Sequence, residues 1–105
     1  MQTWHVITTV DAVQDLDNFV YYLLVEKMND HAATALLDDF DETIEKLSEV
    51  AGSLKPLDDQ ELADEGYRKI RLRRHRYYLI YRVEGKQAIV DRMLHDLQDI
   101  DKALK

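Results

Sequence analysis

Tyr67–His95 reads YRKIRLRRHRYYLIYRVEGKQAIVDRMLH, and this stretch decides the fold. Its side chains alternate in character at every second position, which predicts three β-strands, Tyr67–Arg73, Tyr77–Val83 and Gln87–His95. Glu84–Lys86, a Glu-Gly-Lys sequence, predicts a hairpin turn between the last two strands. Because the connections are short, we expect neighbouring strands to be antiparallel.

Upstream of these strands the sequence predicts a short strand and two amphipathic helices. Thr3–Thr9 is rich in β-branched and aromatic residues, which favour a strand, and we expect Asp11 to cap the helix that follows. The apolar face of that helix is Val13, Leu16, Phe19, Val20, Leu23, Leu24 and Met28. A second helix is expected from near His31 to Gly52, and we interpret its acidic run Asp38–Glu49 as a solvent-exposed face.

The remaining segments complete an α+β fold with the order β-α-α-β-β-β-α. Residues 52–66 predict a loop with one helical turn at Asp58–Ala63, and Leu97–Leu104 predicts a closing helix. We expect a helical hairpin packed on a small, mostly antiparallel sheet, with Leu79, Tyr81 and Val83 buried beneath it. The opposite face of the sheet is expected to carry the basic side chains Lys69, Arg71, Arg73 and Arg82.

Length, composition and charge bound the class of protein. The chain has 105 residues, no Cys and a net charge of −7, so a disulfide or a Cys-based zinc site is excluded. The charge is uneven, because sixteen of the 21 acids lie in residues 1–66 and eleven of the fourteen bases lie in residues 67–105. Met1–Val10 has no signal-peptide pattern, and the apolar run Phe19–Val25 is too short to span a membrane. We therefore expect one domain, residues 1–105, with no membrane association.

A basic cluster is the first candidate functional feature. Seven of the fourteen bases fall within fifteen residues: Arg68, Lys69, Arg71, Arg73, Arg74, Arg76 and Arg82. Arginine suits phosphate because its planar guanidinium forms paired hydrogen bonds and keeps its charge, and Tyr77 and Tyr78 could stack on bases. Two alternatives stay open: a charged edge strand that resists aggregation, or bases that pair with the chain's own acids.

His95 is the second candidate, within the sequence Asp-Arg-Met-Leu-His-Asp at residues 91–96. A histidine at a strand end can transfer protons near neutral pH, and the adjacent Asp96 could orient it. The alternative is a histidine that packs against the closing helix. No spacing of His, Asp or Glu predicts a metal site, and no phosphate-binding loop is present, so we expect no metal and no cofactor.

These motifs resemble the RelE/ParE superfamily of type II toxins, which includes plasmid-stabilisation toxins. The resemblance rests on GYRKI at residues 66–70, YLIYRVEG at 78–85 and VDRMLHDLQD at 90–99, and the last of these is similar to a ParE-like ending. Upstream, the matching positions are Asp15-Leu16 and Asn29 with Ala32-Ala33. The resemblance covers nearly the whole chain. One departure is Tyr78, because many members have Arg at that position.

The resemblance implies the toxin of a bacterial toxin–antitoxin pair. RelE-like members cut mRNA at the ribosome with residues on the sheet, whereas ParE-like members inhibit DNA gyrase and need no catalytic site. Our first hypothesis is growth arrest by a metal-independent endoribonuclease that cleaves mRNA at the ribosome. Its catalytic residues would be His95, Arg82 and Arg92, and its nucleic-acid-binding residues Lys69, Arg71, Arg73, Arg74 and Arg76.

Two alternatives remain: a ParE-like gyrase inhibitor without catalytic activity, and an inactive toxin-fold regulator. The resemblance also implies a cognate antitoxin, a toxin–antitoxin hetero-oligomer and a cytoplasmic location, with either the mRNA and ribosome or DNA gyrase as the target.

Overall fold

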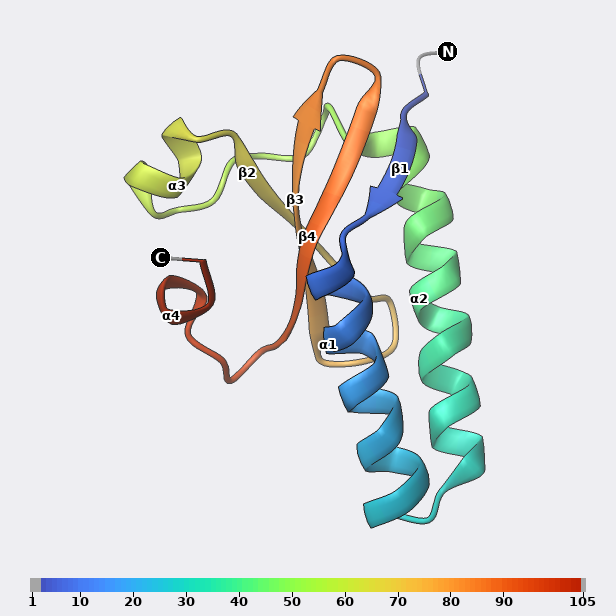
Figure 1. The fold of residues 1–105 in the computed structure, drawn as a ribbon. Coiled ribbons are helices and arrows are strands. Elements are labelled where there is room, and N and C mark those ends of the chain that lie inside the picture. The colour runs from blue at the N-terminus through green and yellow to red at the C-terminus, as the bar shows by residue number, and fades with distance from the viewer. Residues whose placement is uncertain (1–2, 105) are drawn as a thin grey trace.

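A computed structural model describes residues 3–104 and confirms the predicted α+β fold class (Figure 1). The prediction of one domain over residues 1–105 includes Met1, Gln2 and Lys105, which lie outside the described residues. The elements in chain order are β1 His5–Thr8, α1 Val10–Tyr21, the π-helical segment η1 Tyr22–Glu26, α2 Asp30–Val50, α3 Gln60–Asp64, β2 Tyr67–Arg71, β3 Tyr77–Glu84, β4 Gln87–His95 and α4 Ile100–Leu104. In the described part of the chain, no helix is long and apolar enough to cross a membrane.

The four strands form one mixed sheet in the order β1-β4-β3-β2. The β2–β3 and β3–β4 pairs are antiparallel, as predicted from the short connections, and β1 pairs in parallel with the first half of β4. Strand β1 ends opposite Val90. Beyond that point helix α1 replaces it along the edge of β4, where the Asp15 carboxylate accepts the N–H of Met93 at 2.9 Å. Strand β2 forms the opposite edge of the sheet.

The hairpin of α1 and α2 covers one face of the sheet, as predicted (Figure 1). Leu79 and Tyr81 are fully buried beneath it, and Val83 is half-buried against the same core. The buried hydroxyl of Tyr81 donates a 2.7 Å hydrogen bond to the carbonyl of Ala51 at the end of α2. Each fully buried large side chain contributes about 2 kcal/mol from loss of apolar surface to water, so this layer accounts for much of the stability.

Local capping sets where the helices begin, and it corrects one predicted detail. Thr9, rather than Asp11, caps α1, because its side chain accepts the N–H of Ala12. Asn29 caps α2 by accepting the N–H of Ala32, so this helix begins at Asp30, next to the predicted start near His31. The first helix is not regular to its end, because it changes to π-helical hydrogen bonding in η1. The chain then turns at Met28, whose φ of 49° lies in the left-handed region.

The other face of the sheet is not left to basic side chains alone, which corrects the sequence prediction. Strand β2 ends at Arg71, so Arg73 lies in the following loop. Helices α3 and α4 lie over this face, which we call the α4 face (Figure 1). A second apolar cluster fills the space between them: Leu57, Leu62, Tyr78, Ile80 and Leu94, with Tyr67 and Ile100 packed against it. The alternation pattern of the strands gives no information about the short helices α3 and α4. These two helices therefore determine which side chains of this face are exposed.

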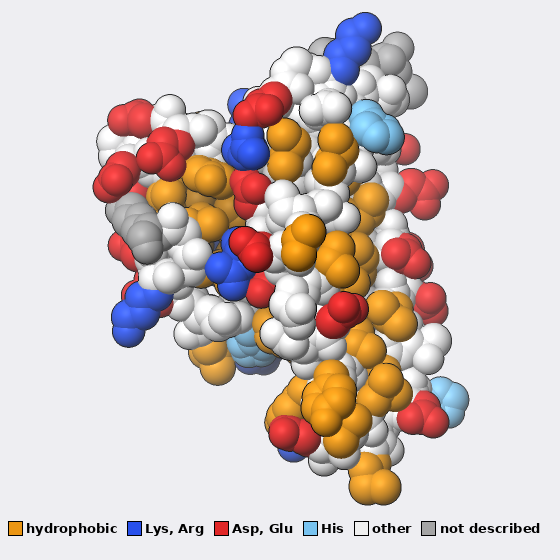
Figure 2. Space-filling view, viewed as in Figure 1, with side chains coloured by type: hydrophobic (Ala, Val, Ile, Leu, Met, Phe, Trp, Pro, Cys, Tyr) orange, Lys and Arg blue, Asp and Glu red, His pale blue; other side chains and the backbone are white. Residues whose placement is uncertain are grey.

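The end of the hairpin that is remote from the sheet exposes large apolar side chains. We call this set the hairpin end: Tyr21, Tyr22, Leu24, Val25, Met28 and Leu37. Met28 is 84% exposed, although the spacing of apolar residues had assigned it, with Leu24, to the buried face. Figure 2 shows hydrophobic side chains gathered at this lower end of the molecule. The hairpin extends past the sheet at this end (Figure 1).

A close contact between the turn after α2 and the N-terminal segment gives a testable prediction for Gly52. A Cβ at this position would lie 2.5 Å from Cζ2 of Trp4, far inside van der Waals contact. We expect Gly52→Ala to lower the free energy of unfolding by about 1–3 kcal/mol, measured by urea denaturation, because a large ring must move. Trp4→Phe should remove the clash, so the same alanine should cost less in that background. Equal costs in both backgrounds would contradict the explanation.

Candidate functional site

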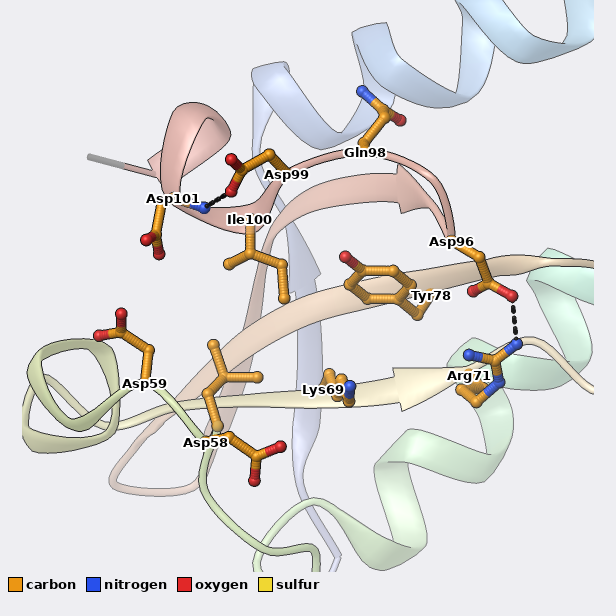
Figure 3. A pocket seen from close by; sticks show the side chains of 11 residues that line it. Asp58, Asp59, Lys69, Arg71, Tyr78, Asp96, Gln98, Asp99, Ile100 and Asp101 are labelled. Carbon is orange, nitrogen blue, oxygen red and sulfur yellow. Dashed lines mark hydrogen bonds and ion pairs between the residues drawn. The ribbon is translucent and has the colours of Figure 1, made fainter.

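A pocket of about 530 Å³ opens on the α4 face of the sheet, between the segment before α3 and the segment that leads into α4 (Figure 3). Its basic side chains are Lys69 and Arg71, both predicted to bind nucleic acid. Its acidic side chains outnumber them: Asp58, Asp59, Asp96, Asp99 and Asp101. The acids make the pocket unfavourable for a phosphate backbone, because like charges repel. Among residues 3–104, no three acidic or histidine side chains are arranged to hold a metal ion.

Tyr78 forms the floor of this pocket, at the position where the resembling family often has arginine (Figure 3). Its ring is buried, and the ammonium of Lys69 lies 5.5 Å from the ring centroid. Burial, together with the nearby charge of Asp96, raises the pKa of Tyr78 above its ordinary value of 10.0. The phenol is therefore neutral at physiological pH and can donate a hydrogen bond but cannot act as a base.

Arg71 is held at one end of the pocket by Asp96, with 2.6 Å between Nη2 and Oδ2 (Figure 3). The hydrogen bond from Arg71 lowers the pKa of Asp96 below its ordinary value of 3.8, so this carboxylate stays charged at neutral pH. The sequence had suggested that Asp96 could orient His95. Instead, Asp96 pairs with Arg71.

The structure does not bring the three predicted catalytic residues together. His95 pairs with Tyr77 across the β3–β4 ladder, and Tyr77 packs into the core under the hairpin. Arg92 pairs with the buried Ile80 on the α4 face, and Arg82 also lies on that face. Tyr77 and Arg82 are five residues apart on β3, so at about 3.4 Å per residue their backbones are separated by about 17 Å.

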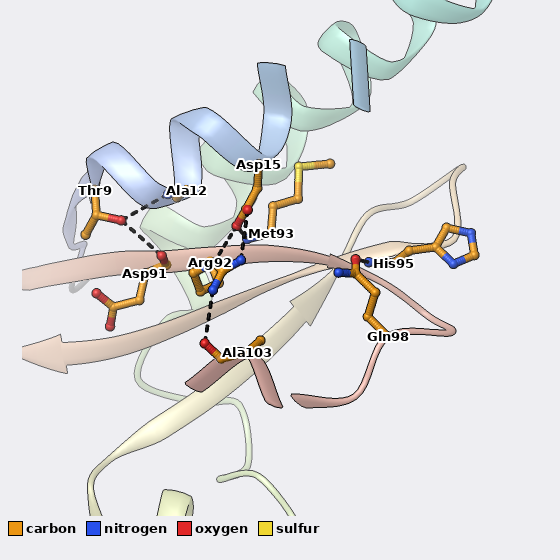
Figure 4. A network of polar contacts seen from close by, with 9 residues as sticks. All are labelled: Thr9, Ala12, Asp15, Asp91, Arg92, Met93, His95, Gln98 and Ala103. Carbon is orange, nitrogen blue, oxygen red and sulfur yellow. Dashed lines mark hydrogen bonds and ion pairs between the residues drawn. The ribbon is translucent and has the colours of Figure 1, made fainter. Parts of the chain in front are cut away.

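The contacts of His95 involve the turn that follows β4 (Figure 4). Its Nδ1 accepts the N–H of Leu97 at 3.1 Å, and its own N–H donates to Oε1 of Gln98 at 2.8 Å. Its ring meets the edge of the Tyr77 ring at 5.2 Å between centroids. With Nδ1 as an acceptor, the neutral ring carries its proton on Nε2. These contacts are with the turn before α4 and with Tyr77 of β3, and the catalytic role of His95 stays a prediction.

Arg92 ties three segments together (Figure 4). Its Nε and Nη2 donate to the two carboxylate oxygens of Asp15 in α1 at 2.7 and 3.0 Å. Its Nη1 donates to the carbonyl of Ala103 in α4 at 3.0 Å. The hydrogen bond with Asp15 raises the pKa of Arg92, so the guanidinium is permanently charged. This geometry makes Arg92 a link between α1, β4 and α4.

The sequence had left open whether the bases pair with the chain's own acids, and several do. Arg82 donates to Asp91 at 2.9 Å and also contacts Glu84. Arg74 pairs with Glu42 of α2 at 2.9 Å. The pairs of Arg71 and Arg92 complete the set. Within residues 3–104, no ion pair is formed by Lys46, Lys69, Arg73 or Arg76.

The loop between β2 and β3 is fixed by a buried carboxylate that the sequence had assigned to the exposed face of the second helix. Asp39 is 0% exposed, and it accepts the N–H groups of Arg73 and Arg74 at 3.1 and 2.9 Å. Its Oδ2 lies 2.7 Å from Nδ1 of His75. Burial alone would raise the pKa of Asp39, but the hydrogen bonds from His75, Arg74 and Arg73 lower it below 3.8.

The structural roles of two carboxylates, Asp39 and Asp15, were missed from the sequence, although a signal was present for Asp39. Asp39 lies between Leu36 and Thr43 at helical spacing, and both of these residues are buried. Asp15 is next to the buried Leu16 and has no such signal, because only the fold brings it to the edge of β4.

Comparison with known proteins gives a match to one family model and several solved structures. The family is described as "ParE toxin of type II toxin-antitoxin system, parDE", and its model matches residues 6–100. No curated protein matches the chain. A chain of the chromosomal ParDE toxin–antitoxin system from P. aeruginosa is 24% identical with a TM-score of 0.70, and the match covers 89% of this chain and 96% of that one.

Two further structures share the fold. A chain of the toxin–antitoxin complex RelBE2 from Mycobacterium tuberculosis has a TM-score of 0.58 at 22% identity, with 90% of this chain and 93% of that chain covered. YafQ from E. coli has a TM-score of 0.51 at 14% identity, with 97% and 99% covered. At these identities the structural matches support the shared fold alone.

Proposed function

Because the chain belongs to the ParE toxin family of type II toxin–antitoxin systems, we propose that it arrests growth by binding a protein target, DNA gyrase, without cutting RNA. Its action would then depend on an interaction surface and not on a catalytic site. The gyrase target comes from the resemblance to ParE-like toxins, and the choice of binding over cleavage comes from the arrangement of side chains.

The observation that carries this proposal is the exposed hairpin end. Two tyrosines, three large aliphatic side chains and Met28 are exposed together on a helical hairpin that extends past the sheet. A monomeric protein rarely leaves such side chains clustered in water, whereas protein interfaces are enriched in aromatic residues and methionine. The π-helical segment η1 and the left-handed Met28 fall within the same end, and irregular backbone of this kind is frequent at functional sites.

The arrangement of the predicted catalytic residues supports the same choice. A ribonuclease must place a proton-transferring group and cationic groups around one phosphate. His95 faces the hairpin side of the sheet, whereas Arg82 and Arg92 lie on the α4 face and are engaged by Asp91 and Asp15. The pocket on the α4 face, which none of these three residues lines, carries more acidic than basic groups.

Cleavage of mRNA at the ribosome is the second candidate, with Lys69 and Arg71 of the pocket as its specific support. The nucleic-acid-binding residues would be Lys69, Arg71, Arg73, Arg74 and Arg76. They follow one another from β2 into the loop between β2 and β3, which Asp39 holds in place. His95, Arg82 and Arg92 would remain its catalytic residues. This reading needs the acids of the pocket to move away when RNA binds.

Either candidate includes a cognate antitoxin and a toxin–antitoxin hetero-oligomer in the cytoplasm. We infer the antitoxin from the family, since type II systems pair a toxin with a protein inhibitor. The inactive regulator is the remaining alternative, in which the fold is kept for complex formation alone.

The two candidates separate in one experiment. DNA and protein synthesis are pulse-labelled in cells within minutes of inducing the chain alone, as the wild type and as His95→Ala. We expect DNA synthesis to fall first, and the His95→Ala protein to be as toxic as the wild type, because no proton transfer is required. An early collapse of protein synthesis that His95→Ala abolishes would overturn the proposal in favour of the ribonuclease. No effect on either process would leave the inactive regulator.

A further inference from the structure

A hollow with a volume of about 520 Å³ lies between the second half of α2 and β2, on the hairpin side of the sheet. We call it the α2–β2 hollow. Four segments border it: α2, the turn after α2, β2 and the loop that follows β2. Pockets of about 300–1,000 Å³ are the ones that hold small organic molecules in proteins. The α2–β2 hollow therefore has the size of a small-molecule site, and none of the predicted catalytic residues lines it.

Three apolar side chains form one wall of the α2–β2 hollow: Val50, Leu54 and Ile70. All three are half-buried, and Leu54 and Ile70 pack from the inner side against the main core. Because β2 is the last strand of the sheet, the outer side of this wall stays in contact with water. A ligand with an apolar body would remove this surface from water, which favours binding.

Most polar side chains of the α2–β2 hollow are already engaged within the chain. The hydroxyls of Thr43 and Ser53 donate to backbone carbonyls at 2.7 and 2.9 Å. Glu42, the acid among the lining residues, pairs with Arg74 at 2.9 Å. Arg71 also borders the hollow, and it pairs with Asp96. These groups therefore have little capacity left for a ligand.

Two cations of the α2–β2 hollow are different, because Lys46 and Arg73 form no ion pair within residues 3–104. They come from two elements, Lys46 from α2 and Arg73 from the loop after β2. Asp39 accepts the backbone N–H of Arg73 at 3.1 Å, which holds this part of the loop in place before any ligand binds. A carboxylate is the complement of such a pair, because it accepts charge-assisted hydrogen bonds from both cations.

We propose that the α2–β2 hollow binds a small aliphatic monocarboxylate of medium chain length. Its carboxylate contacts Lys46 and Arg73, and its chain covers the wall of Val50, Leu54 and Ile70. A nucleotide fits less well, because the residues that line the hollow include no aromatic ring on which a base could stack. This site goes beyond the proposed function, because it is separate from the hairpin end and does not depend on which target the chain binds.

The test titrates sodium octanoate into the ¹⁵N-labelled chain near neutral pH and follows the amide signals by NMR. We expect saturable shifts of the Val50, Leu54 and Ile70 amides, with a dissociation constant on the order of 1 mM or tighter. Octanamide has the same chain without the charge and should bind about tenfold more weakly. Acetate keeps the charge without the chain and should give no saturable shift over the same concentrations. Equal binding by octanamide, or saturation by acetate, would overturn the proposal.

Removal of the two cations provides the second arm of the test. Lys46→Gln combined with Arg73→Gln should weaken octanoate binding by about tenfold, and both side chains are exposed, so the fold should be kept. The matched control is Lys86→Gln combined with Lys102→Gln, which removes the same charge from exposed positions outside the hollow. It should change affinity by less than about twofold. No saturable binding, shifts confined to the hairpin end, or equal weakening by the control would each refute the site.

Discussion

Tyr21→Ser combined with Val25→Ser is expected to weaken binding to the target by about 100-fold and to abolish growth arrest. Tyr21 is 62% exposed and Val25 is 51% exposed, so neither holds the fold together. In an interface each would lose contact area worth about 1–2 kcal/mol, and about 1.4 kcal/mol corresponds to a tenfold change in affinity. The measurement is inhibition of supercoiling by purified gyrase, together with survival of cells after induction.

The matched control for this prediction is Val10→Ser. Val10 is also an exposed aliphatic residue of α1, but it lies at the start of the helix, far from the hairpin end. It should retain full inhibition. Circular dichroism and thermal unfolding of both proteins should match the wild type within a few degrees, because surface substitutions change stability little. Full inhibition by the double variant would remove the hairpin end from the target interface.

Asp39→Ala is expected to lower the free energy of unfolding by about 3 kcal/mol. The buried carboxylate accepts two backbone N–H groups and contacts His75, and alanine would leave all three without this partner. For a domain of this size, about 3 kcal/mol corresponds to a fall in Tm of about 15 °C. Asp38→Ala, on the exposed side of the same helix turn, is the control and should change Tm little.

Stability should also depend on pH through Asp39. Its pKa in the folded protein lies below the ordinary value of 3.8, so the folded state favours the charged carboxylate. The contribution is fully present above about pH 4–5, where the unfolded chain is also ionised, and is lost as pH falls through the folded value. The Asp39→Asn protein should lack this part of the acid transition in urea titrations at pH 2–6. An unchanged pH profile would show that Asp39 contributes no such linkage.

The sheet and the hairpin could be predicted from the sequence because their signals are periodic. Alternation placed Leu79 and Tyr81 under the hairpin, and helical spacing placed Leu16 in the core. These patterns report which side chains share a face of one element. The resemblance to RelE/ParE toxins agreed with the same order of elements, and the family match over residues 6–100 confirms it.

The sequence could not determine what covers each face. Helices α3 and α4 are five residues each, too short for a periodic signal, yet they cover the face on which basic side chains were expected. Helical spacing likewise assigned Met28 to a buried face, although it is 84% exposed where the hairpin extends past the sheet. Periodicity describes one segment, whereas exposure depends on the segments that pack against it.

The sequence by itself determined the fold class, the order of the strands along the chain and the division between an acidic first part and a basic second part. Only the tertiary structure decided how the charges are used. It buried Asp39 under the basic loop, joined Asp15 to Arg92, and placed His95 on the opposite face of the sheet from Arg82. Partners 34 to 77 residues apart in the chain meet only when the helices dock on the sheet, because a buried charge is stable only beside its partners.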